Sequence, residues 1–134
     1  MNKVQIDLTG AKILAVDDVP ANLDVLSQAL EAGGYNVLVA TSGETALDLV
    51  SRIEPDLILL DVMMPGMDGL QVAREVRSRP QHDDVRIILL TAKGQDRDIE
   101  AGLAAGADDY MTKPFSPSRL LARTRDVLES RRKG

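Results

Sequence analysis

The sequence contains no cysteine and no tryptophan. Without cysteine the chain has no disulfide bond, thiolate metal ligand or cysteine nucleophile, and a cytoplasmic location is the expectation. One phenylalanine and two tyrosines are too few to form a stacking surface for nucleic-acid bases or a flavin ring. No apolar run approaches the roughly 20 residues of a membrane span, and residues 1–10 lack the apolar stretch of a signal peptide. The sequence therefore predicts neither a membrane protein nor an exported one.

The charge is unevenly divided along the chain. The 134 residues carry a net charge of −5, which is the sum of −9 over residues 1–118 and +4 over residues 119–134. The acidic body is expected to repel nucleic acid, and the short basic end is interpreted as a solvated helix end or the start of a linker. With 44% hydrophobic and 28% charged residues, the length and composition are typical of one globular domain.

Short apolar runs alternate with longer stretches of helical periodicity. The runs have the length of buried strands and lie at residues 13–16, 37–40, 57–60 and 87–90, with a weaker one at 108–112. Five amphipathic helices are expected to follow the five strands, the last of them after Pro117. Strands that are apolar along their whole length and alternate with helices predict the α/β class, in which helices cover both faces of a parallel sheet.

Polar residues follow the predicted strands where each strand ends. They are Asp17 and Asp18, Asp61, Thr91, and Lys113. Because the carboxyl ends of parallel strands lie along one edge of the sheet, we expect these side chains to meet there. Taken singly, each has an ordinary explanation as a helix cap or a turn residue. Three carboxylates close together, however, repel one another unless a cation or a proton lies among them.

The expected cluster has the chemistry of phosphoryl transfer. Carboxylate oxygens with room for water suit Mg²⁺. Lys113 can pair with Asp61 and later with a phosphoryl oxygen, while the Thr91 hydroxyl donates to another. Together these groups supply a nucleophile and fixed positive charge for the phosphoryl oxygens, and Asp61 is the predicted nucleophile. Asp68, in the loop that follows, is interpreted as a helix cap and not as a ligand.

Taken together, these residues resemble the response regulator receiver domain of two-component signalling. The resemblance is carried by VDD at 16–18, LLDVMMPGMDG at 59–69, TA at 91–92 and TKPF at 112–115. It covers residues 11–131, which leaves 1–10 as an N-terminal extension and 132–134 as a tail or the start of a linker. It implies a flavodoxin-like, doubly wound parallel sheet of five strands in the order 2-1-3-4-5, with five helices.

The same resemblance implies a role for each site residue. Asp61 would receive a phosphoryl group from the phosphohistidine of a sensor histidine kinase or a histidine phosphotransfer protein and become an aspartyl phosphate. Asp17, Asp18, Asp61 and the backbone carbonyl of Met63 would hold Mg²⁺. Thr91 would be the switch hydroxyl.

Further roles are implied on the fifth strand. Lys113 would bind the phosphoryl group, with a cis peptide before Pro114, and Tyr110 would be the switch aromatic. The change would reach the surface of the fourth helix, fifth strand and fifth helix, which an effector domain or target protein would read. Dimerisation on phosphorylation is a further expectation, and turnover of an external substrate is not expected.

Three other function classes were weighed. A dehalogenase-type phosphatase needs a second acid two residues after its nucleophile, where this chain has Met63. A nucleotide-binding domain needs a glycine-rich loop after the first strand, and residues 17–22 contain no glycine. A receiver-like binding module that never takes up phosphate stays open, because a fold does not by itself establish a function.

Overall fold

The computed structural model describes residues 8–92 and 96–133. The described strands and helices alternate along the chain: β1 (Lys12–Val16), α1 (Pro20–Ala32), β2 (Asn36–Ala40), α2 (Gly43–Ile53), β3 (Leu57–Asp61), α3 (Gly69–Arg77), η1 (Pro80–His82), β4 (Arg86–Ala92), α4 (Asp96–Ala104), β5 (Asp109–Lys113) and α5 (Pro117–Lys133). The predicted strands and helices are therefore confirmed, and the short 3₁₀-helix η1 is the addition that the periodicity did not predict.

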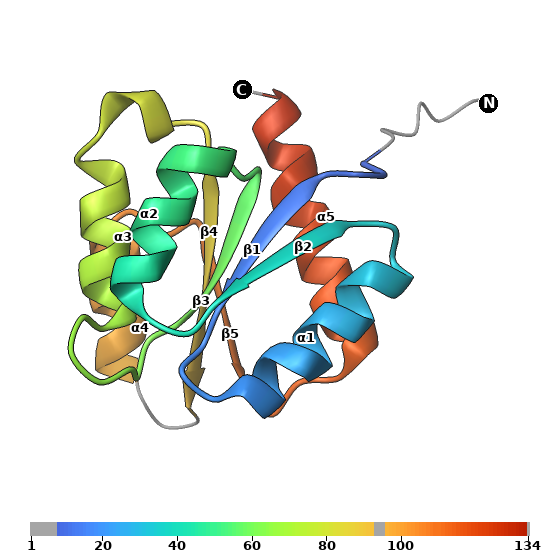
Figure 1. Ribbon diagram of the computed structural model, residues 1–134, viewed down its shortest axis with the longest axis horizontal. Coiled ribbons are helices and arrows are strands. Elements are labelled where there is room, and N and C mark those ends of the chain that lie inside the picture. Colours follow the sequence, from blue (N-terminus) through green and yellow to red (C-terminus); the bar gives the residue numbers. More distant parts are fainter. Residues whose placement is uncertain (1–7, 93–95, 134) are drawn as a thin grey trace.

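The sheet is parallel throughout and its strands lie in the order β2-β1-β3-β4-β5. Helices α1 and α5 cover one face, and α2, α3 and α4 cover the other (Figure 1). The direction of chain winding reverses between β1 and β3, which are neighbours in the sheet. This is the doubly wound, flavodoxin-like arrangement that the motifs implied, and the reversal point is where such sheets place their sites.

The central strand β3 shows how the sheet separates two hydrophobic cores. All of its residues are buried, because both faces are covered. Leu57 and Leu59 pack with residues of α1 and α5, whereas Ile58 and Leu60 pack with residues of α2 and α3. Full burial of each such leucine or isoleucine contributes about 1.5–3 kcal/mol. The last residue of β3, Asp61, is thereby placed at the carboxyl ends of the strands.

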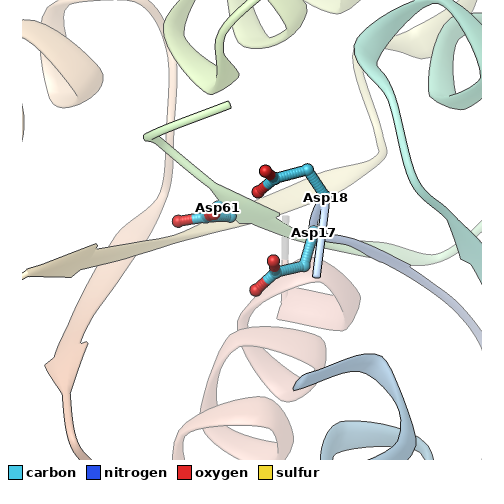
Figure 2. A group of neighbouring side chains, drawn as sticks. All are labelled: Asp17, Asp18 and Asp61. Carbon is cyan, nitrogen blue, oxygen red and sulfur yellow. The ribbon is translucent and has the colours of Figure 1, made fainter. Parts of the chain in front are cut away.

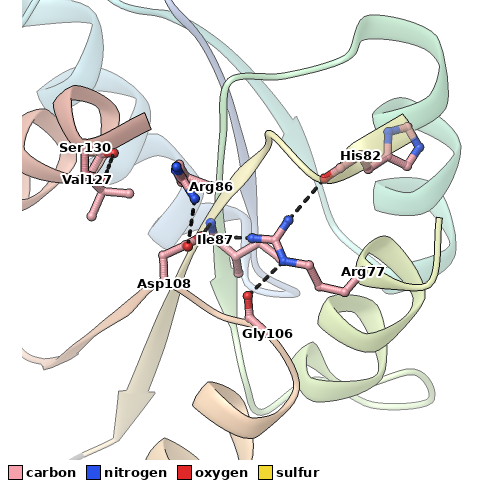
Figure 3. A network of polar contacts seen from close by, with 8 residues as sticks. All are labelled: Arg77, His82, Arg86, Ile87, Gly106, Asp108, Val127 and Ser130. Carbon is pink, nitrogen blue, oxygen red and sulfur yellow. Dashed lines mark hydrogen bonds and ion pairs between the residues drawn. The ribbon is translucent and has the colours of Figure 1, made fainter. Parts of the chain in front are cut away.

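Arg77, the last residue of α3, joins three segments at the sheet edge opposite to the carboxyl ends of the strands (Figure 3). Its guanidinium donates to the carbonyl oxygens of Gly106 at 2.9 Å and His82 at 3.1 Å, and to the Asp108 carboxylate at 2.9 Å. Asp108 also accepts from the Ile87 N–H at 2.8 Å. The half-buried guanidinium thus joins the end of α3 to η1 and to the segment before β5.

The two ends of the predicted domain differ in how they join the fold. Leu8, in the predicted N-terminal extension, is buried among residues that pack under α1 and α5. Residues 1–7 of that extension lie outside the described part of the chain. Helix α5 continues to Lys133, so residues 132 and 133 of the predicted tail extend this helix, and Gly134 lies outside the described residues.

Candidate functional site

Three carboxylates meet at the carboxyl ends of β1 and β3. Asp17 and Asp18 follow β1, Asp61 ends β3, and one oxygen from each lies within 4.8 Å of the others. Figure 2 shows the three carboxylates directed to the same side of the strand ends. They meet because β1 and β3 pair directly, with Val16 beside Leu60. Asp17 and Asp61 are buried, whereas Asp18 is half-buried.

Lys113 provides the positive charge of the cluster. It is the last residue of β5, and its Nζ lies 3.3 Å from Asp61 Oδ1 and 3.4 Å from Asp17 Oδ2. The peptide bond between Lys113 and Pro114 is cis, as the resemblance implied. One ammonium therefore faces two buried carboxylates, and the half-buried Asp18 adds a third acidic group to the cluster.

Asp17 is held by the first turn of α1. Its Oδ1 accepts from the Val19 N–H at 2.9 Å, and its Oδ2 accepts from Asn22 Nδ2 at 3.1 Å. Asn22 is not among the site residues predicted from the sequence. Asn22 lies in the first turn of α1, and its spacing from Asp17 gives no sign of this bond in the sequence. These bonds fix Asp17 and reduce the repulsion between carboxylates.

Thr91 and Tyr110, the two predicted switch residues, lie on β4 and β5. Thr91 is buried, and its hydroxyl donates to the Met111 carbonyl oxygen at 3.5 Å, a long and therefore weak hydrogen bond. Tyr110 pairs with Leu89 across the sheet, and its half-buried side chain packs against the core on the α2 and α3 side. The structure thus brings Thr91 to the carboxyl ends of the strands and Tyr110 deeper into β5.

The loop after β3 covers one side of the cluster. The Met63 N–H donates to the Asp61 carboxylate, while Met63 itself is 63% exposed. Asp68 is the N-cap of α3, where it forms a capping box with Gln71. The interpretation of Asp68 as a cap is therefore confirmed.

Burial sets the ionisation of Asp61. Desolvation is the largest effect and raises the pKa of its carboxyl above the ordinary value; Lys113 opposes this shift, and the neighbouring Asp17 adds to it. The folded chain consequently holds a proton on Asp61 more firmly than the unfolded chain does. Carboxylate oxygens are also the donors that hard divalent cations take, so Asp17, Asp18 and Asp61 form a donor set that could hold a metal ion.

This shift predicts a pH-dependent stability. Between the ordinary pKa of Asp61 and its raised folded value, the folded chain binds more protons, so the Asp61 contribution to stability falls as pH rises. In the presence of EDTA, Asp61→Asn is expected to be more stable than the parent at pH 7, with a difference that shrinks toward pH 4. Urea unfolding of both proteins across this pH range measures the difference. A difference that does not vary with pH would contradict the prediction.

Comparison with known proteins assigns the chain to a family. Residues 13–125 match the response regulator receiver domain, and the chain belongs to this family. Receiver domains are the phosphoacceptor switches of two-component response regulators. Among curated relatives, the response regulator MprA of Mycobacterium leprae (strain TN) is 49% identical over 117 residues, which are 87% of this chain and 50% of MprA. The chain thus spans half the length of that relative.

Solved structures agree with this assignment. The chemotaxis protein CheY4 of Vibrio cholerae is 34% identical, with a TM-score of 0.84 over 89% of this chain and 99% of the other. The receiver domain of a signal transduction histidine kinase from Syntrophus aciditrophicus is 35% identical, with a TM-score of 0.84 over 90% of this chain and 92% of the other. The flavodoxin-like fold and the family are both confirmed. Within the described residues, no helix is both long and apolar enough to cross a bilayer.

Proposed function

We propose that Asp61 is the phosphoacceptor of this receiver domain. A carboxylate oxygen of Asp61 attacks the phosphorus of a phosphohistidine, the phosphorus–nitrogen bond breaks, and the imidazole leaves as an aspartyl phosphate forms. The observation that carries the proposal is the position of Asp61 at the end of β3, 3.3 Å from Lys113 Nζ and within 4.8 Å of two further carboxylates. Its donor would be a sensor histidine kinase or a histidine phosphotransfer protein.

The proposed metal is Mg²⁺, held by Asp17, Asp18, Asp61 and the backbone carbonyl of Met63. The set of carboxylate oxygens supports this choice, since Mg²⁺ is a hard cation that takes oxygen ligands. When bound, the ion supplies positive charge that offsets the phosphoryl oxygens. Lys113 is proposed to move from Asp61 to a phosphoryl oxygen, and it needs little displacement because it already lies between two carboxylates.

Thr91 and Tyr110 are the proposed switch. The Thr91 hydroxyl makes only a 3.5 Å bond to Met111, so a new phosphoryl oxygen at Asp61 offers it a stronger acceptor. Rotation of Thr91 toward that oxygen would vacate space that the half-buried Tyr110 ring can fill. The surface formed by α4, β5 and α5 then changes, and a target protein or effector domain reads it.

Tyr110→Ala tests this relay. The variant is expected to take up phosphate as the parent does but to lose the phosphorylation-dependent change in amide hydrogen exchange along α5, because no ring is left to fill the vacated space. Tyr110→Phe keeps the ring and is expected to behave like the parent. Hydrogen exchange read by mass spectrometry, with and without acetyl phosphate, makes the comparison. A parent-like response in Tyr110→Ala would remove the residue from the switch.

Phosphate uptake itself is tested with acetyl phosphate as a small phosphoryl donor. The parent is expected to gain the mass of one phosphoryl group in the presence of Mg²⁺, and to gain none in EDTA, since the carboxylates alone repel the donor. Intact-mass spectrometry reads both samples. A parent that stays unlabelled with Mg²⁺ would instead favour the binding module that never takes up phosphate, and rapid hydrolysis of small phosphate esters would favour a phosphatase.

The remaining expectations are part of the same proposal. Residues 11–131 are proposed to be the receiver domain, with 1–10 as an extension and 132–134 as a tail or linker start. Dimerisation on phosphorylation, the absence of direct nucleic-acid binding and a cytoplasmic location stay predictions. The negative charge of residues 1–118 supports the absence of nucleic-acid binding, because it opposes binding to phosphate backbones.

A further inference from the structure

Strand β2 forms one edge of the sheet and has an open side. It pairs with β1, and within residues 8–92 and 96–133 no strand pairs with its other side. The Asn36 N–H donates to the Ala11 carbonyl at 3.0 Å, and the Ala40 carbonyl accepts from the Asp17 N–H at 3.1 Å, so both residues face β1. Successive residues of a strand point their backbone N–H and C=O groups to alternate sides. Those of Val37 and Val39 therefore point to the open side of β2.

The open edge of β2 is apolar and uncharged. Leu38 is 39% exposed and Val39 is 45% exposed, and no charged residue lies between Glu31 and Glu44. Natural edge strands are usually protected against pairing by charged side chains, proline or bulges, and β2 has none of these.

The opposite edge of the sheet is protected in the expected way. Strand β5 begins at Asp109 and ends at Lys113. Asp109 accepts from Arg123 of α5 at 2.6 Å, so a charged pair lies beside this edge. The contrast between the two edges of the same sheet indicates that β2, and not β5, is suited to pair with another strand.

We propose that β2 is a homodimer interface, in which the β2 edges of two copies pair antiparallel about a two-fold axis at Leu38. Val37 of one copy then lies opposite Val39 of the other, and the two residues exchange their N–H and C=O groups. Leu38 contacts Leu38 of the other copy on the α2 face of the sheet, because Ala40, two residues on, packs in the core of that face. Val37 and Val39 lie on the α1 face.

The occupant is a second copy because this edge is complementary to itself. A strand without charge brings no like-charge repulsion when it meets its own copy, and the pattern of outward groups at Val37 and Val39 is symmetric about Leu38. The contact is isologous, so it uses both open edges and closes as a dimer without forming a fibre. It needs no phosphoryl group, which separates it from dimerisation on phosphorylation.

The interface is small and the copies repel at a distance. Pairing of two short strands falls below the roughly 1,000 Å² of a stable interface, so a dissociation constant of about 0.1–1 mM is expected. The net charge of −5 on each copy opposes association, and salt screens this repulsion. Dimerisation is therefore expected to strengthen as the salt concentration rises.

Sedimentation of the parent without phosphoryl donor, from about 10 µM to 1 mM protein, tests the proposal over the range around the expected dissociation constant. The average mass should rise from 14.5 kDa toward twice that value. Amide exchange followed by NMR should slow at Val37 and Val39 with rising concentration and stay unchanged at Asn36, whose N–H already donates to the Ala11 carbonyl. A mass that stays at 14.5 kDa throughout would overturn the proposal.

A matched pair of variants identifies the surface. Val39→Lys places a charge on the open edge and should weaken association at least about tenfold, because two like charges then approach across the axis. Leu103→Lys makes the same change on α4, where Leu103 is 47% exposed, and should leave association unchanged. Association that is lost in Leu103→Lys but kept in Val39→Lys, or that occurs only after acetyl phosphate treatment, would overturn the proposal.

Discussion

Asp61→Asn is expected to take up no phosphoryl group from acetyl phosphate and Mg²⁺ under conditions that label the parent. The amide keeps the size of the side chain but lacks a charged oxygen that can bond to phosphorus. Asp17 cannot replace it readily, because its oxygens are engaged by the Val19 N–H, Asn22 and Lys113. Labelling measured by intact mass should fall by at least about a hundredfold, as the loss of a nucleophile implies.

Asp84→Asn is the matched control for this experiment. Asp84 is exposed and lies between η1 and β4, at the end of the sheet away from the carboxylate cluster. The control removes the same charge by the same chemical change and should be labelled like the parent. Equal labelling of Asp61→Asn and the parent would show that another residue accepts the phosphoryl group, and peptide mapping would locate it.

Gly69→Ala is expected to cause the largest loss of stability. Gly69 is the first residue of α3, and its N–H donates to the Val62 carbonyl at 3.0 Å. A Cβ on Gly69 would collide with the Asp61 carbonyl oxygen and lie 2.9 Å from the Val62 Cα. These are backbone atoms of the strand end that carries Asp61, so they cannot move aside without displacing the site. A loss of about 3 kcal/mol in the free energy of unfolding is expected.

Gly66→Ala separates this collision from the ordinary cost of replacing glycine. Gly66 lies in the loop before α3 with a φ of 75°, and a Cβ there would meet no atom within 4 Å. Its replacement should therefore cost only about 1 kcal/mol, for the left-handed backbone. Urea unfolding followed by circular dichroism gives both values. If Gly69→Ala loses no more stability than Gly66→Ala, the close packing of β3 against α3 is not what requires glycine.

Local periodicity was enough to predict the strands and helices. The short helix η1 and the contacts between remote segments are visible only in the structure. The 3₁₀-helix η1 has too few residues for any period to be visible. The role of Arg77 in joining three segments could not be predicted from the sequence, because Gly106 and Asp108 lie 29 and 31 residues away from it. The strand order itself came from the resemblance to the receiver family, since periodicity states which segments are strands and not which strands are neighbours.

The candidate site shows the same division. The positions of Asp17, Asp61 and Lys113 at strand ends followed from the sequence, because a parallel sheet brings all such ends to one edge. That Lys113 lies between both carboxylates depends on side-chain distances between the ends of β1, β3 and β5. The Asn22 bond to Asp17 depends on how α1 leaves β1, which no spacing reveals.

The sequence by itself determined the class of fold, the end of the strands at which the candidate site lies and the residue types present there, because apolar periodicity and strand ends are local properties. Only the tertiary structure decided that burial raises the pKa of Asp61, that Gly69 contacts the backbone of β3, and that one side of β2 is unpaired within the described residues. Each of these depends on distances between segments that are remote in the chain, and such distances are set by packing.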